Sequence, residues 1–112
     1  MISKLNKIKR AELMKAILLL RNPSEAARFF RDLLTEKELI EFGNRWKAAR
    51  MLSEKIIYTK IEKETGLSST TVARVSNWLN KGKGGYKLVL KRINSHKHNS
   101  LSLKGKGCVD IS

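Results

Sequence analysis

Small, polar and cationic side chains recur at helical spacing in the segment from Tyr58 to Asn80. These residues are Ser69, Thr70, Ala73, Arg74 and Asn77. Such side chains suit the edges of bases in the major groove of DNA, where hydroxyl, amide and guanidinium groups exchange hydrogen bonds with them. The chemistry they indicate is recognition of duplex DNA by one helix placed in the major groove.

A second pattern in the same segment predicts how that helix is held. Ile61, Gly66, Leu67, Val72 and Val75 follow the order of a helix-turn-helix, in which a short turn containing glycine joins two packed helices. The glycine permits the tight turn, the leucine fills the angle, and the valines hold the second helix against the first. The position four residues before the glycine is commonly small. Here it is Glu62, so either the angle between the two helices differs or this side chain points outward.

Charge favours DNA over the alternative that residues 58–80 are merely two packed helices. The chain has 24 Lys and Arg against 10 Asp and Glu, a formal net charge of +14. Between Gly66 and Val109 there are basic residues but no acidic one. A charge run is usually a solvated face, but this one begins within the predicted second helix. The residues predicted to contact DNA are Thr59, Lys60, Ser68, Ser69, Thr70, Ala73, Arg74, Asn77, Lys81 and Lys83.

Other classes of protein are disfavoured. Cys108 is the only cysteine, which excludes an intramolecular disulfide and a thiolate zinc site, and His96 and His98 lie in a polar tail. There is no glycine-rich phosphate loop, paired-carboxylate site or nucleophile elbow, so we expect neither an enzyme nor a bound metal or cofactor. No apolar run approaches the roughly 18 residues of a membrane span. We therefore expect a cytoplasmic protein associated with the nucleoid, with no membrane partner.

Apolar periodicity and capping residues predict an all-α chain of six helices. The first spans about residues 4–20, and the second begins at Pro23 after a cap at Asn22. Capping boxes at Thr35 and Thr59 begin the third and fourth helices, which end near residues 53 and 65. The fifth spans about 68–79 and the last about 86–93. We expect one helical domain for DNA binding and dimerisation over 1–94, then a basic flexible tail over 95–112.

The ordered combination of several short segments resembles the Trp repressor family, and looks most like its YerC/YecD-type branch. The segments are Leu34-Thr35-Glu36-Lys37-Glu38, Gly43-Asn44-Arg45-Trp46, Ala49-Arg50-Met51-Leu52, the run 58–66, and Thr71-Val72-Ala73-Arg74-Val75. The resemblance covers about residues 10–93. It implies a six-helix fold and an intertwined homodimer with two helix-turn-helix heads. A shared core would also cover the many large apolar side chains of so small a chain.

The resemblance also implies an effector pocket. In the Trp repressor, tryptophan sits between the third helix and the second helix of the helix-turn-helix. Thr35, Arg45, Thr71 and Arg74 match the threonine and arginine positions of that pocket. Each also has a simpler role. Thr35 can cap a helix, and the stem of Arg45 can pack at the edge of the third helix. Thr71 can pack or face solvent, and Arg74 can contact a phosphate. Val75 stands where the repressor has glycine, and its branched side chain would fill the space of the ring. We therefore expect another small effector, or none, in place of tryptophan.

Three functions remain open at this point. The leading one is a homodimeric, sequence-specific transcriptional regulator that represses by occupying a DNA operator. The second is a nonspecific nucleic-acid-binding or RNA-associated structural protein that uses its basic surface. The third is an interaction module whose basic tail meets an anionic membrane, which the weak amphipathicity of the tail disfavours.

Overall fold

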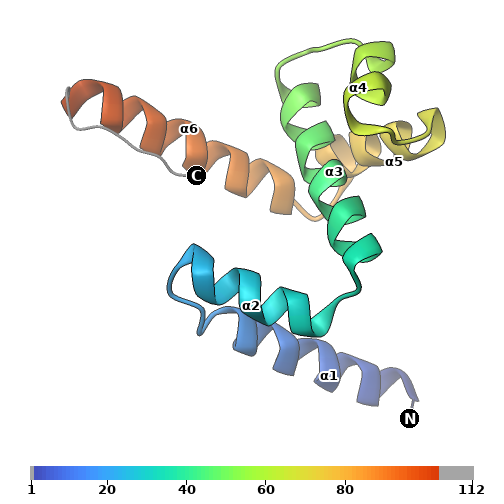
Figure 1. The fold of residues 1–112 in the computed structure, drawn as a ribbon, viewed down its shortest axis with the longest axis vertical. Helices are drawn as coiled ribbons and strands as arrows, with labels where there is room; N and C mark the ends of the chain where they lie inside the picture. The colour runs from blue at the N-terminus through green and yellow to red at the C-terminus, as the bar shows by residue number, and fades with distance from the viewer. Residues whose placement is uncertain (1, 104–112) are drawn as a thin grey trace. The chain divides into compact units, whose positions relative to one another are not determined.

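The computed structural model describes residues 2–103, and the side chains of residues 3–95. Within these residues the chain is all helical, as predicted, with no strand. Figure 1 shows the helices in chain order. They are α1 (Ile2–Ile17), α2 (Pro23–Leu33), α3 (Glu36–Ser53), α4 (Tyr58–Thr65), α5 (Ser69–Lys81) and α6 (Gly85–Leu103).

The chain forms two compact units, Met1–Glu41 and Phe42–Ser112. The first contains α1, α2 and the start of α3, and the second contains the rest of α3 with α4, α5 and α6. The expectation of one domain over 1–94 stays a prediction, since each unit is described by itself.

The first unit begins its second and third helices at the predicted caps. Asn22 Oδ1 accepts a hydrogen bond from the Glu25 N–H at 2.9 Å, and Pro23 occupies the first turn of α2. Thr35 and Glu38 form a reciprocal capping box. Thr35 Oγ1 accepts from the Glu38 N–H at 3.1 Å, and Glu38 Oε1 accepts from the Thr35 N–H at 2.9 Å. Local hydrogen bonding therefore fixes both starts, as the sequence predicted.

The first helix ends earlier than predicted, at Ile17 instead of about residue 20. Leu19 and Leu20 donate their N–H groups three residues back, to the carbonyls of Ala16 and Ile17, at 3.1 Å each. The chain thus leaves α1 through a tight turn before α2 restarts at Pro23. The apolar periodicity predicted a longer helix because it includes these leucines, which lie in the turn after α1.

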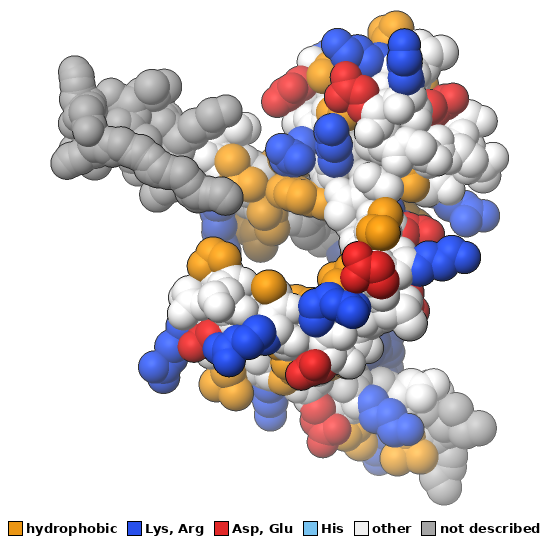
Figure 2. All heavy atoms as spheres, in the orientation of Figure 1, with side chains coloured by type: hydrophobic (Ala, Val, Ile, Leu, Met, Phe, Trp, Pro, Cys, Tyr) orange, Lys and Arg blue, Asp and Glu red, His pale blue; other side chains and the backbone are white. Residues whose placement is uncertain are grey.

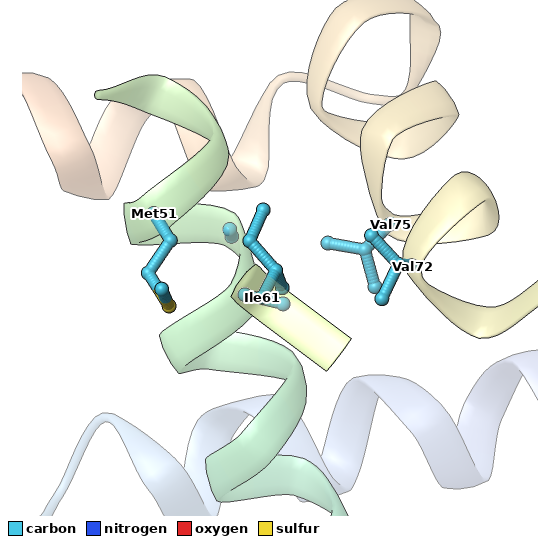
Figure 3. Close-up of a cluster of buried hydrophobic side chains, with 6 residues drawn as sticks. Met51, Ile61, Val72 and Val75 are labelled. Atoms are coloured by element: carbon cyan, nitrogen blue, oxygen red, sulfur yellow. The ribbon is translucent and has the colours of Figure 1, made fainter. Parts of the chain in front are cut away.

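The core lies in the second unit and joins three helices. Ala48, Ala49 and Met51 of α3, Ile61 of α4, and Val72 and Val75 of α5 form one buried cluster. Figure 3 shows Met51 on α3, Ile61 beside that helix, and the two valines pointing from α5 toward Ile61. The predicted helix-turn-helix core of Ile61, Val72 and Val75 is confirmed, because none of the three has measurable exposed surface.

Two element boundaries of the second unit differ from the predictions. The fourth helix begins at Tyr58 with Ile57 at its cap and no side-chain capping bond, so the predicted capping box at Thr59 is wrong. The Ile57 carbonyl already accepts the N–H of Ile61 at 3.2 Å, which places Thr59 inside the first turn.

The last helix runs to Leu103, well past Ile93, so the helix includes the start of the segment predicted to be a flexible tail. Polarity alone does not end a helix, and residues 94–103 contain no glycine or proline that would. The side chains of His96 and His98, and all of residues 104–112 with Cys108, lie outside the described part of the chain.

Candidate nucleic-acid interface

The turn between α4 and α5 is built from Thr65 to Ser68. Gly66 has a φ of +75°, the left-handed conformation that favours glycine, so the prediction that this glycine permits the tight turn is confirmed. Thr65 is buried. Its hydroxyl donates to the Ile61 carbonyl at 2.7 Å and accepts from the Leu67 N–H at 3.2 Å. Ser68 Oγ accepts from the Thr71 N–H at 3.1 Å and so caps α5.

The α5 helix has one buried face and one exposed face. Val72, Val75 and Leu79 are buried, at helical spacing. Because successive residues of a helix are rotated by about 100°, Thr70, Arg74 and Asn77 point away from that face. They are exposed. The α5 helix therefore presents the predicted base-reading residues to solvent, and it is called the recognition helix below.

All the residues predicted to contact DNA are exposed. Thr59 and Lys60 lie on α4, Ser68 to Lys81 on the recognition helix and its cap, and Lys83 in the loop before α6. These residues lie on elements that follow one another in the chain, which agrees with one surface shared by their side chains. Contact with DNA itself stays a prediction.

Glu62 is the residue four before the turn glycine, where the helix-turn-helix pattern commonly has a small side chain. Glu62 is partly exposed, while its neighbour Ile61 is fully buried. The buried residues of α4 beside the turn are therefore Ile61 and Thr65, and Glu62 is not part of the core.

Charge is not uniform over the second unit. From Ser69 to Ser95 the chain carries only basic charged residues. The α4 helix is mixed, and Lys47 Nζ of α3 lies 3.6 Å from Glu64 Oε1 of α4. Figure 2 shows Lys and Arg side chains interspersed with Asp and Glu over the part that contains α3 and α4. The positive charge that could meet phosphates therefore belongs to α5 and α6 more than to α4.

Arg45 makes a contact that sequence reasoning missed. Its Cζ lies 5.8 Å from the ring centroid of Trp78 on the recognition helix and 5.6 Å from that of Phe42. Beside it, the rings of Trp46 and Tyr86 are stacked with centroids 6.2 Å apart. No local spacing could have indicated the Arg45–Trp78 pair, since the residues come from different helices.

The residues of the expected effector pocket have different surroundings. Thr35 is exposed and caps α3, in the first unit. In the second unit Arg45 and Thr71 are half-buried and Arg74 is exposed. Val75 is a fully buried member of the core. That these residues line one pocket stays a prediction.

Two further observations hold for the described residues. No three His, Cys, Asp or Glu side chains in this part of the chain gather into a group that could hold a metal ion. None of the helices there combines the length and the apolar character needed to cross a membrane.

Comparison with known proteins agrees with this fold. The family described as Trp repressor protein matches residues 9–94. The YerC protein of Bacillus subtilis (strain 168) is 41% identical over 92 residues, which cover 82% of this chain and 88% of YerC.

Two solved structures are similar in fold and sequence. The TrpR-like protein from Eubacterium eligens ATCC 27750 superposes with a TM-score of 0.77 at 37% identity, covering 82% of this chain and 95% of its own. A protein of Staphylococcus aureus described as a candidate Trp repressor gives a TM-score of 0.75 at 38% identity, with coverages of 83% and 93%. The resemblance noted in the sequence is thereby confirmed, and the chain belongs to the Trp repressor family.

Proposed function

We propose that this chain is a sequence-specific transcriptional regulator that binds DNA as a homodimer and represses by occupying an operator. It is a binding protein and not an enzyme, and it acts on DNA in the cytoplasm. The observation that carries the proposal is the recognition helix. Its buried face of Val72, Val75 and Leu79 leaves Ser69, Thr70, Ala73, Arg74 and Asn77 exposed beside a run of basic residues.

Base contacts and phosphate contacts have separate sources on this surface. Arg74 and Asn77 lie on the exposed face of the recognition helix, where bidentate contacts to bases discriminate sequence. Lys81 and Lys83 follow at its C-terminal end, where contacts to phosphates position the helix without reading sequence. This division is expected of a specific regulator.

Dimerisation is supported by the apolar surface of the first unit. None of the described side chains from Ser3 to Glu41 is buried. Exposed large apolar residues in this unit are Leu5, Ile8, Met14, Leu18, Leu19, Leu33 and Ile40. So many exposed apolar side chains are typical of a surface covered by a partner. Light scattering at low micromolar concentration should report twice 12.8 kDa, and a stable monomer would contradict the intertwined dimer.

The experiment that tests the function is selection of bound fragments from a random DNA pool, followed by competition with random duplex. We expect a two-fold symmetric site with half-sites about one helical turn apart. Arg74→Ala should weaken binding by roughly 5- to 150-fold for each half-site, the effect of losing about 1–3 kcal/mol of base discrimination per contact. Arg50→Ala is the matched control, because Arg50 is also exposed but lies on α3.

A nonspecific nucleic-acid-binding or RNA-associated protein is the second candidate, favoured by the net charge of +14. It predicts equal affinity for every duplex in the same competition. Salt dependence does not separate the two candidates, because both neutralise phosphates, whereas the specificity ratio does.

A further inference from the structure

We propose that Arg45 is a positioning residue for DNA recognition, which orients the recognition helix by holding the indole of Trp78. The inference rests on the proposed function, since it assumes that α5 reads DNA. It concerns a contact within the protein and not a residue that touches DNA.

The guanidinium of Arg45 lies near two aromatic rings. Its Cζ lies 5.6 Å from the centroid of Phe42, on the same helix, and 5.8 Å from that of Trp78, on the recognition helix. The Nε atom is buried. A cation near an aromatic face within about 6 Å is attracted by the ring, most strongly by tryptophan, and the attraction grows as water is excluded.

The position of Trp78 on α5 links this contact to the residues that face DNA. Trp78 is 41% exposed and directly follows Asn77, and it lies four residues, about one turn, after Arg74. It therefore occupies the flank between the buried face and the exposed face. Because a helix rotates as a rigid unit, fixing the direction of the indole also fixes the directions of Arg74 and Asn77.

The core and the Arg45–Trp78 pair hold the recognition helix in different ways. Val72 and Val75 hold the recognition helix through apolar contacts, which are non-directional. The Arg45–Trp78 pair adds a contact that depends on the direction in which the ring points. The indole also borders a wide, open apolar depression of the surface with Trp46, Tyr86 and Val89. A ring bordered by open space on one side can turn unless it is held on another.

A double-mutant cycle tests the proposal on the full-length protein. Arg45→Met and Trp78→Leu should each weaken specific binding roughly three- to tenfold, the range of a partly exposed cation–π contact. The double variant should be no weaker than the worse single variant, because both changes break one contact. Trp78→Phe, which keeps a weaker ring, should be intermediate. Arg50→Met is the control and should leave affinity unchanged.

Two further measurements separate positioning from other roles. Thermal unfolding and light scattering should show that the variants keep their fold and mass. The dependence of affinity on salt should keep its slope, since removing a direct phosphate contact by Arg45 would lower the slope by about 0.9 for each protomer of the homodimer. Additive effects, unchanged affinity in Arg45→Met, or a lower slope would overturn the proposal.

The emission of Trp78 gives a readout that needs no DNA. The chain has two tryptophans, so Trp46→Phe leaves Trp78 as the only fluorophore of that type. In this background Arg45→Met should change the emission of Trp78, and Arg50→Met should not. An unmodified protein without preference for any duplex would overturn the proposed function, and the role in DNA recognition with it. Unchanged emission would overturn the Arg45 contact by itself.

Discussion

The hydroxyl of Thr65 accepts a hydrogen bond from the N–H of Leu67 at 3.2 Å, across the glycine that joins α4 to the recognition helix. The same hydroxyl donates to the Ile61 carbonyl at 2.7 Å. One buried side chain thus hydrogen-bonds both the Ile61 carbonyl of α4 and the Leu67 N–H of the turn that follows. The angle between the two helices depends on this threonine as well as on Gly66.

Thr65→Val should therefore lower the free energy of unfolding by about 1–3 kcal/mol, since valine keeps the shape but leaves the Leu67 N–H without its partner. Thermal or urea unfolding measures the loss. Thr65→Ser should be closer to the unmodified protein, because it keeps the hydroxyl. Thr59→Val, on the exposed side of α4, is the control and should change stability by less than about 0.5 kcal/mol.

Gly43 lies inside α3, where an added methyl group would meet nothing within 4 Å in the described part of the chain beyond its own helix. Gly43→Ala should raise the free energy of unfolding by about 0.5–1 kcal/mol, because alanine favours the helix. Urea unfolding together with light scattering checks this. A variant that loses stability or dimer mass would show that a second copy packs closely against this glycine.

Lys81 and Lys83 should supply phosphate contacts in the proposed complex. Replacing either with glutamine should weaken binding to specific and random duplexes by similar factors. Each replacement should also reduce the salt slope by about 0.9 per protomer, because each copy in the homodimer neutralises one phosphate fewer. Affinity titrations over a range of salt concentrations measure both effects. Lys55→Gln is a control of the same residue type outside the recognition helix and its loop. Weaker binding at the specific site alone would indicate base reading instead.

Tryptophan should neither bind nor change affinity for the operator. The side chain of Val75 is fully buried between the helices, packed in the core with Ile61 and Val72. Calorimetry with L-tryptophan at millimolar concentration should show no saturable heat. Micromolar binding with a matching rise in operator affinity would contradict this prediction.

Removing the Val75 side chain should mainly damage the core. Val75→Gly leaves a cavity and adds glycine to a helix, so we expect a loss of roughly 2–4 kcal/mol of unfolding free energy. The propensity of glycine alone would account for only about 1 kcal/mol. A loss no larger than that would show that Val75 contributes little to packing.

The sequence by itself determined the features that depend on neighbouring residues. Asn22, Thr35 and Ser68 cap helices because each side chain reaches a backbone N–H three residues ahead. Gly66 turns the chain because it alone adopts a positive φ at little cost there. Val72 and Val75 lie at helical spacing on one helix, and Ile61 precedes them in the helix-turn-helix pattern, so their shared burial was predictable.

Tertiary structure decided what depends on residues far apart in the chain. Arg45 meets Trp78 only because α3 and the recognition helix pack together. Thr65 is buried only in the folded turn between α4 and the recognition helix. Val75, which the family pattern places at a pocket, belongs to the core for the same reason. Spacing along a sequence fixes which side chains share a face of one helix. It carries no information on which face of another helix they meet, because that is set by the packing of the whole unit.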